Sequence, residues 1–335
     1  MDKLRRQLKQ LYMTCFPEDS KTYAEFFVKN KFDGTNCLTA FDGQKLVTML
    51  YLVKKKMYVR GKVFFTPYLT AGGTLPEYRG RGIFNEFLRQ AMIKLRKEGN
   101  PITGLMPFDH EFYKLQNFVT HSFYREKTLV RGKLPLKEIS FENIPEMKKA
   151  YDFFMKDKNC WFYRDEDAFE LRLKEIFCEG GKAYGLYDGD NFEGYILTFD
   201  DEEVDEYLGI YDDVIDKYDT HFEYVKVNTG PEGEPDNMFR ICDCKKLLSE
   251  ICYPTDVEEE ITVCVNDPFL KANGGCFALS VKEGRAVVSD AAEGEISLHI
   301  DDLTRLVTGS YVKGSFDGRL EKLLPPSLNC ALDKF

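Results

Sequence analysis

The part of this sequence best suited to chemistry is a short run of arginines and glycines between two apolar segments. The run is Arg79-Gly80-Arg81-Gly82-Ile83-Phe84, and it follows Thr70-Ala-Gly-Gly-Thr-Leu-Pro-Glu-Tyr. Glycines permit tight turns and allow the backbone to come close to a ligand. Free backbone N–H groups at a helix start attract anions, and Arg79 and Arg81 add positive charge. We therefore predict a pyrophosphate cradle, distinct from the GxxxxGK[ST] and GxGxxG patterns.

The elements around this run have the order that such a cradle needs. We expect helices at 3–15 and after Ser20, and strands at 37–41, 46–53, 57–59 and 63–72. The cradle then opens a helix over about 82–98, whose apolar stripe predicts one buried face. A strand at 102–106, a short helix near 110–116 and a strand at 123–130 follow. An ordinary glycine-containing turn between strand and helix is the alternative interpretation, and this context favours the cradle.

The sequence also repeats itself in part. A hairpin with an Asp-Gly turn occurs at 37–53 and again at 183–199, each time after two predicted helices, which in the second case span about 145–157 and 166–178. A Pro- and Gly-rich joint at 230–235 precedes strands at 238–242, 261–265, 276–281 and 296–300, with helices near 244–251 and 301–309. The chain therefore reads as a unit, its shorter copy, and a small α+β unit.

The cradle and three further segments resemble a known family. Residues 79–84 look like the R/Q-x-x-G-x-G/A signature of the GNAT superfamily of N-acetyltransferases, with Phe84 at the last position. A bulky residue there is found in the enhanced intracellular survival (Eis) branch, which the whole chain resembles. Phe112–Phe118, Trp161–Arg164 and the Pro-rich tail ending at Phe335 resemble other segments of that branch, although Gln116-Asn117 replaces its Phe-Gly.

The resemblance implies an α+β fold of tandem GNAT folds followed by a sterol-carrier-protein-like domain. The GNAT folds would have mixed, mostly antiparallel sheets with helices. A catalytic GNAT domain would span residues 1–135, a degenerate second GNAT-like domain 136–235, and the sterol-carrier-protein-like α+β domain 236–335. The implied activity is transfer of the acetyl group of acetyl-CoA directly to a primary amine.

The resemblance also implies roles for individual residues. Tyr113 would be the general acid that protonates the CoA sulfur, and the terminal carboxylate on Phe335 would be the base. Backbone groups of Gly72, Gly73 and Thr74 would pair with pantetheine. The pyrophosphate would lie on the run from Gly80 to Asn85, which comprises Gly80, Arg81, Gly82, Ile83, Phe84 and Asn85, with Phe108 near the acetyl group. Asp109, Glu111 and His110 are weaker candidates for contacting the amine or relaying protons.

Composition limits the partners. A net charge of −10 argues against nucleic acid, because phosphate binding needs a basic surface. The charge is compatible with a small cationic amine or a lysine-bearing substrate. We expect no metal, since Cys242-Asp-Cys244 lacks the second ligand pair of a zinc site. We also expect the cysteines, including Cys178, Cys264 and Cys276, to be small buried hydrophobes of a cytoplasmic protein.

Two alternatives to catalysis stay open. The chain could be an acyl-CoA sensor without turnover, or its C-terminal unit could carry a lipid or another small apolar ligand. A carrier would need an open apolar tunnel within about 236–335. We also expect no membrane segment, because no apolar run approaches the ~20 residues that span a bilayer. An oligomer, a hexamer in the Eis branch, is implied by resemblance alone.

Overall fold

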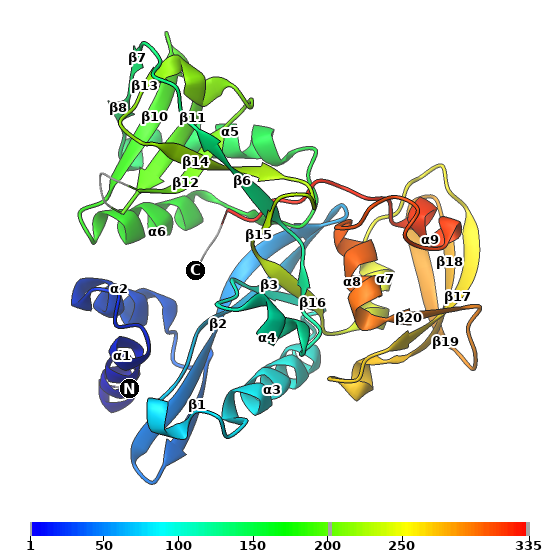
Figure 1. The fold of residues 1–335 in the computed structure, drawn as a ribbon. Coiled ribbons are helices and arrows are strands. Elements are labelled where there is room, and N and C mark those ends of the chain that lie inside the picture. Colours follow the sequence, from blue (N-terminus) through cyan, green and yellow to red (C-terminus); the bar gives the residue numbers. More distant parts are fainter. Residues whose placement is uncertain (1, 200–202, 333–335) are drawn as a thin grey trace.

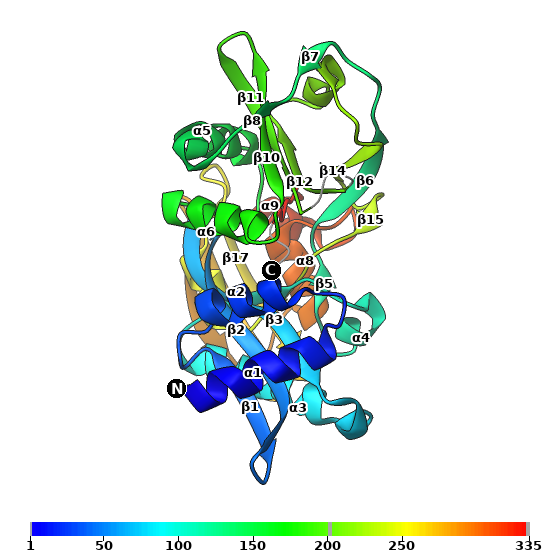
Figure 2. The ribbon, with the colours of Figure 1, turned by 90° about the vertical axis from the view of Figure 1, so that its left-hand side faces the viewer.

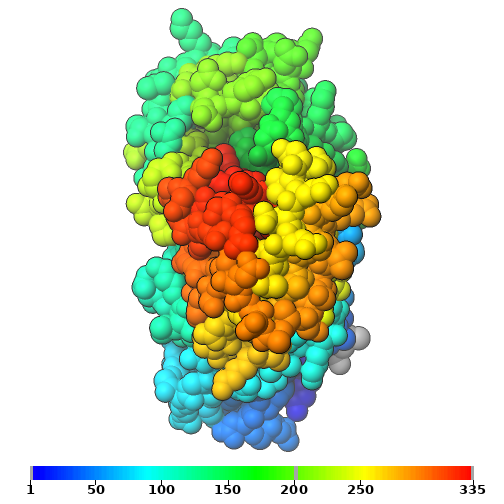
Figure 3. Space-filling model, turned by 90° about the vertical axis from the view of Figure 1, so that its right-hand side faces the viewer, coloured from blue at the N-terminus to red at the C-terminus, as the bar shows by residue number. Residues whose placement is uncertain are grey.

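We describe the protein from a computed structural model that covers residues 2–199 and 203–332. Three parts pack together (Figure 1). The first contains the N-terminal helices and a long twisted sheet, the second lies above it, and the C-terminal part lies beside both. Figure 3 shows the C-terminal part, coloured from yellow to red, between the first part below and the second part above.

The first part is organised by a sheet with the path β1-β2-β3-β4-β16-β5. Neighbours along this path pair antiparallel, except β3 and β4, which run parallel. A short strand of the second part, β9, pairs with β2. The strands are β1 (Cys37–Asp42), β2 (Lys45–Val59), β3 (Lys62–Thr74), β4 (Ile102–Leu105), β5 (Val119–Thr120), β9 (Trp161–Tyr163) and β16 (Met238–Ile241).

The strand β16 is a departure from expectation. The sequence groups it with the C-terminal strands that follow it, whereas it pairs with β4 and β5. Its apolar side chains Met238, Phe239 and Ile241 are fully buried there. Pairing between strands that are distant in the sequence leaves no local pattern there, so the expected grouping of this strand with the C-terminal strands was wrong.

Alternation along β2 explains why helices cover both faces of this sheet. Met49 and Tyr51 pack with α1 (Asp2–Cys15) and α2 (Lys21–Lys31). Leu50 and Leu52 point the other way and pack with α3 (Ile83–Lys97) and α4 (His110–Lys114). A single-turn helix, η1 (Pro76–Tyr78), links β3 to α3.

The second part carries a four-stranded sheet, β12-β11-β10-β8, covered by α5 and α6. Two small sheets, β14-β6-β15 and β13-β7, flank it. Its elements are β6 (Phe123–Thr128), β7 (Leu134–Pro135), β8 (Lys137–Glu138), η2 (Phe141–Asn143), α5 (Ile144–Met155), α6 (Glu166–Phe177), β10 (Lys182–Asp188), β11 (Asn191–Thr198), β12 (Val204–Gly209), η3 (Val214–Lys217), β13 (Tyr218–Asp219), β14 (Tyr224–Thr229) and β15 (Glu234–Pro235).

The two hairpins of the sequence repeat share their irregularity as well as their turn. The register shifts between Ala40 and Phe41 in β1–β2 and between Leu186 and Tyr187 in β10–β11. In each hairpin the glycine after the turn aspartate has a positive φ, 57° at Gly43 and 61° at Gly189. Glycine adopts this conformation without the steric cost that a Cβ would add.

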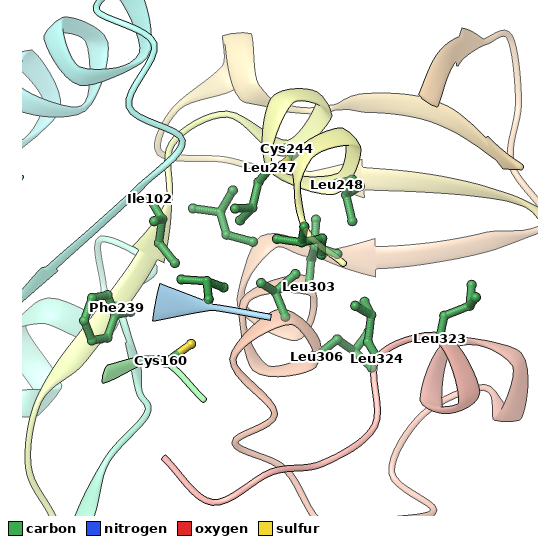
Figure 4. Close-up of a cluster of buried hydrophobic side chains, with 14 of the residues drawn as sticks. Ile102, Cys160, Phe239, Cys244, Leu247, Leu248, Leu303, Leu306, Leu323 and Leu324 are labelled. Carbon is green, nitrogen blue, oxygen red and sulfur yellow. The ribbon is translucent and has the colours of Figure 1, made fainter. Parts of the chain in front are cut away.

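The C-terminal part is a sheet, β19-β18-β17-β20, with helices on one side. Its elements are α7 (Cys244–Glu250), β17 (Glu259–Asn266), η4 (Lys271–Asn273), β18 (Gly275–Lys282), β19 (Arg285–Ala291), β20 (Ile296–His299), α8 (Ile300–Thr308) and α9 (Gly318–Leu323). Its core is continuous with the first sheet: Ile102 and Phe239 lie in the same cluster as Leu247, Leu303 and Leu306 (Figure 4).

A buried ion pair joins the same two parts. Arg240 of β16 contacts Asp267 at 2.7 Å, and both side chains are fully buried. Asp267 also accepts hydrogen bonds from the Leu270 backbone N–H and the Asn273 side chain. The buried Asp267 carboxylate therefore has hydrogen-bond donors in addition to Arg240, as a buried charge requires.

Three cysteines differ from expectation. Cys264 of β17 and Cys276 of β18 lie directly opposite each other and form a disulfide. Neither they nor Cys178 is fully buried. Register decides which residues face each other across two strands, and the sequence does not reveal it, so describing these three as buried, unpaired hydrophobes was wrong.

Candidate active site

The first sheet opens where β3 and β4 part. The two strands pair at Tyr68–Gly104 and Leu69–Leu105, after which β4 ends and β3 continues to Thr74. Within the described residues, no strand pairs with β3 beyond Leu69 on that side. The backbone groups of this free edge can pair with an extended ligand as a further strand would.

A β-bulge deforms β3 at the same point. The register with β2 slips between Met49 and Tyr51, and Ala71 has a φ of 47°, in the left-handed region. A bulge bends the strand and re-aims the groups next to it, and a non-glycine residue with positive φ marks local strain. The free edge is therefore strongly twisted where Gly72, Gly73 and Thr74 leave the sheet.

Gly72 and Gly73 at this edge are required because a side chain at either position would clash with a neighbour. A Cβ on Gly72 would lie 2.5 Å from the Phe84 ring, and one on Gly73 would lie 2.8 Å from the Cys15 sulfur. Phe84, the departure from the usual glycine or alanine, thus packs directly on the β3 edge because Gly72 has no side chain. The hydroxyl of Thr74 is 3.2 Å from that of Thr48, which ties β3 to β2.

The glycines before α3 are instead required by their backbone conformation. Gly80 and Gly82 have φ of 73° and 74°, and nothing lies within 4 Å of a Cβ added at either position. Gly82 is the N-cap, so the backbone N–H groups of Ile83, Phe84 and Asn85 stand in the first turn, where helices leave N–H groups unpaired. This geometry fits an anion at the helix start.

Arg79 and Arg81 brace the loop. Arg79 Nε donates to the Thr74 carbonyl at 2.9 Å, and Arg81 Nη2 donates to the Glu77 carbonyl at 2.8 Å. Both side chains are otherwise exposed. They therefore fasten the cradle to the end of β3 and keep two positive charges beside it.

Tyr113 lies on α4, on the face of the sheet that α3 covers. Its ring is 5.4 Å from that of Phe108, 5.1 Å from that of Phe112 and 5.8 Å from that of Phe118. Its hydroxyl has no hydrogen-bond partner among the described residues. Burial raises the pKa of Tyr113 well above its ordinary value, so the phenol stays protonated at neutral pH. Phe108, by contrast, is 72% exposed.

The polar residues around Tyr113 have structural partners. Asp109 caps α4 by accepting from the backbone N–H groups of Glu111 and Phe112. The His110 Nε2 atom lies 2.9 Å from the Asp236 carbonyl. The exposed carboxylate of Glu111 pairs with Lys114 at 2.6 Å. These contacts shape the short helix, and none of them directs a charge at the Tyr113 hydroxyl.

The predicted base, Phe335, lies outside the described residues. The tail is described as far as Leu332, and it runs between the first and second parts (Figure 1). The Asn329 side chain donates to the His121 carbonyl, and Cys330 is packed in the core of the second part. Ala331 and Leu332 line a small cavity with Tyr124 and Glu206. The tail is thus fixed close to the sheet up to its last described residue.

The sequence did not reveal a larger cavity of about 290 Å³ on the α2 face of the sheet. It lies between β2 and α6, and residues 53–56 of β2 form one wall. The signal in the sequence was three consecutive lysines, Lys54 to Lys56, in an otherwise apolar strand. Among the described residues there is no group of acidic, histidine or cysteine side chains that could hold a metal, and no helix able to cross a membrane.

Comparison with known proteins agrees with this geometry. Residues 2–119 match the acetyltransferase (GNAT) domain family, and residues 244–313 match the sterol carrier protein domain family. No curated protein matches the sequence.

Solved structures resemble the chain over its whole length. A GCN5-related N-acetyltransferase from Anabaena variabilis has a TM-score of 0.79 at 20% identity, over 100% of this chain and 98% of that one. A probable N-acyltransferase from Enterococcus faecalis has a TM-score of 0.82 at 15% identity, over 99% and 97%. Eis1 from Mycobacterium abscessus has a TM-score of 0.71 at 13% identity, over 100% and 98%.

At these identities the structures establish the fold, and the family matches identify the first and the C-terminal domain. Residues 2–119 form a GNAT acetyltransferase domain and residues 244–313 a sterol-carrier-protein-like domain, and the chain over its whole length has the fold of Eis1.

Proposed function

We propose that the protein transfers the acetyl group of acetyl-CoA directly to a primary amine. The observation that carries this proposal is the juxtaposition on one sheet of three features. These are the free edge of β3, the glycine-opened start of α3, and a buried tyrosine whose hydroxyl lacks a protein partner. An acyl-CoA needs all three: a partner for its extended arm, a site for its phosphates, and a proton donor for its thiolate.

Each predicted residue has a role in this proposal. Gly72, Gly73 and Thr74 pair with the pantetheine arm through their backbone. The cradle from Arg79 to Asn85 binds the pyrophosphate. As the amine attacks the thioester carbonyl, a C–N bond forms and the C–S bond breaks. Tyr113 gives its proton to the leaving sulfur, and Phe108 lines the site beside Tyr113.

The amine must lose a proton in the same reaction. We propose that the carboxylate of Phe335 accepts it, as the family resemblance implies. The described tail supports this proposal as far as Leu332, because it is fixed between the first sheet and the second part. A carboxylate in a partly buried setting has a raised pKa, which suits a base at neutral pH.

The same proposal includes the larger context. The acceptor would be a small cationic amine or a lysine-bearing substrate, and the protein would be a cytoplasmic oligomer. The domains would span 1–135, 136–235 and 236–335, with β9 and β16 completing the first sheet from outside the first domain. Light scattering tests the oligomeric state, and limited proteolysis tests the boundaries.

A carrier or sensor function is the alternative. The described core of the C-terminal part is filled by its own side chains and by those of the first sheet (Figure 4). This packing favours a supporting role for that part. A sensor would bind acetyl-CoA without turnover.

Release of free CoA separates these functions. We expect amine-dependent release from acetyl-CoA with the full-length protein, across a panel of polyamines, lysine derivatives and aminoglycosides. A variant without Phe335 should lose most of it. Binding of acetyl-CoA with no release from any amine would contradict the proposal and favour a sensor.

A further inference from the structure

The described tail, residues 325–332, is fastened at intervals although it forms no helix or strand. Arg60, in the turn between β2 and β3, donates to the Pro325 carbonyl at 2.7 Å. Farther along the tail, the Asn159 backbone N–H donates to the Leu328 carbonyl at 3.0 Å. Chain ends usually fray because little holds their backbone. Contacts at such intervals indicate that the course of this tail serves a purpose.

A side chain of β14 makes the next contact along the tail. The Nδ2 atom of Asn228 donates to the Asn329 carbonyl at 2.6 Å and to the Phe123 carbonyl of β6 at 3.2 Å. Only the NH₂ end of an amide can donate, so these two carbonyls fix the orientation of the side chain. The amide joins the tail to the paired strands β6 and β14, which Figure 2 shows above the first sheet.

The other end of the same amide has no partner. The Oδ1 atom of Asn228 is buried, and the described residues offer it no donor. A buried carbonyl oxygen without a donor costs stability, so folding alone does not explain why an asparagine stands here. Asn228 also lines the small cavity that Ala331 and Leu332 border, next to the last described residue of the tail.

The tail ends close to the opening between β3 and β4. Ala331 is buried in the same core cluster as Tyr68, which pairs with Gly104 just before the two strands part. The Asn237 side chain accepts from the Tyr68 hydroxyl and donates to the Ala331 carbonyl at 3.5 Å. Three residues follow Leu332, and they can span at most about 11 Å. The place of Leu332 therefore limits where the terminal carboxylate can act.

We propose that Asn228 is a positioning residue for acetyl transfer: by fastening the tail at Asn329, it keeps the terminal carboxylate within reach of the attacking amine. Asn228 acts through the tail and not by contact with the reacting atoms. This inference rests on the proposed function, in which that carboxylate takes the proton that the amine loses, and it adds the residue that holds the base in place.

Loss of the contact should dilute the carboxylate at the site. The volume open to a chain end grows about as the 3/2 power of the number of residues beyond its last anchor. Three residues follow Leu332 and seven follow Leu328, so release of the tail back to Leu328 should lower kcat about three- to fourfold. The KM for acetyl-CoA should not change, because the β3 edge and the cradle are untouched.

Two substitutions test the contact. In Asn228→Asp, a carboxylate of the same shape cannot donate and would face two carbonyl oxygens, which should drive the tail off β14. Asn228→Ala removes the donor without adding charge and should act in the same direction, more weakly. Asn30→Asp is the matched control, because Asn30 of α2 also donates from Nδ2 to a backbone carbonyl, that of Phe26, at 2.8 Å. We expect Asn30→Asp to leave kcat unchanged.

The tail carries its own reporter, the thiol of Cys330. This side chain is buried, and burial raises the pKa of the thiol to about 12, so almost none of it is the reactive thiolate. We expect Asn228→Asp to raise the rate at which Cys330 reacts with a maleimide about tenfold or more, with Cys330→Ser giving the background from the other cysteines. Unchanged reactivity of Cys330 in Asn228→Asp would overturn the inference.

The variant without Phe335 separates positioning from a purely structural effect. We expect Asn228→Asp to lower kcat in the full-length protein and to cause no further loss in the variant without Phe335, because the two changes disable the same base. Equal losses in both backgrounds would overturn the inference. No release of CoA with any amine would contradict the proposed function itself, and the reactivity of Cys330 would then still show whether Asn228 fastens the tail.

Discussion

Replacing Tyr113 with phenylalanine separates catalysis from stability, because the structure predicts a large loss of rate without a loss of folding stability. The substitution keeps the ring that contacts Phe108, Phe112 and Phe118 and removes only the hydroxyl. A positioned general acid contributes about 10²- to 10⁴-fold to a rate. We therefore expect kcat for CoA release to fall by about that factor, which corresponds to roughly 3–5 kcal/mol of transition-state stabilisation.

Folding stability should not fall with it. The Tyr113 side chain is largely buried, but its hydroxyl is not among the fully buried polar atoms that lack a partner, and the described residues give it no hydrogen bond, so its removal breaks no protein contact. Its removal should therefore leave the free energy of unfolding unchanged to within about 0.5 kcal/mol. Urea unfolding measures this value, and a free-thiol assay measures the rate. Cys252, an exposed free cysteine, gives a background that does not depend on amine.

Tyr207→Phe is the matched control. The hydroxyl of Tyr207 is buried without a hydrogen-bond partner, and it lies in the second part of the protein. We expect its removal to leave kcat unchanged. Full activity in Tyr113→Phe would refute the role of Tyr113 as the acid. Equal losses in both variants would show that the effect is not local to the site.

Three further substitutions have expected results that follow from the structure. Burial lowers the pKa of His121 to about 3, so the unfolded chain takes up a proton first and stability is lost as pH falls from about 6.5 toward 3. In urea unfolding at pH 5, His121→Gln should recover about 2 kcal/mol of that loss. An unchanged dependence of the free energy of unfolding on pH would contradict this. Gly82 has a φ of 74°, which is strained for alanine, so Gly82→Ala should weaken CoA binding by about fivefold in calorimetry. Gly314 also has a positive φ, 93°, but lies far from the cradle, so Gly314→Ala should not weaken it. Asp267→Ala leaves Arg240 buried without its carboxylate and should lower the free energy of unfolding by about 3–5 kcal/mol; a loss below about 1 kcal/mol would show that the pair is not needed.

Local patterns in the sequence predicted the parts of the site that depend on local geometry. The apolar stripe of α3 and the glycines before it suffice to predict a helix that starts at an anion site. The structure has that helix, with Gly82 as its N-cap. The segment around Tyr113 could be identified only by resemblance, since an aromatic residue in a short helix has no distinctive spacing.

Non-local contacts explain what the sequence did not show. The strand β16 enters the first sheet more than a hundred residues after β4, and its pairing depends on the whole fold. The cavity between β2 and α6 forms only when two parts of the chain come together, so its lysines look like a solvated run in the sequence. The close packing of Phe84 against Gly72 could not be predicted either, because it joins the edge of β3 to the start of α3, which only the folded chain brings together.

The disulfide shows the same limit. Spacing alone could not distinguish Cys264 and Cys276 from unpaired apolar cysteines, since any two residues at that separation can lie on neighbouring strands or apart. The register of β17 and β18 makes them direct partners.

In the proposed reaction, an acetyl group moves from CoA to an amine at the opening between β3 and β4. Mass spectrometry of L-lysine after incubation with deuterated acetyl-CoA tests it most directly. We expect L-lysine to carry the deuterated acetyl group, in an amount that Tyr113→Phe greatly reduces. Unmodified L-lysine and other amines, in the presence of protein that binds acetyl-CoA, would contradict it.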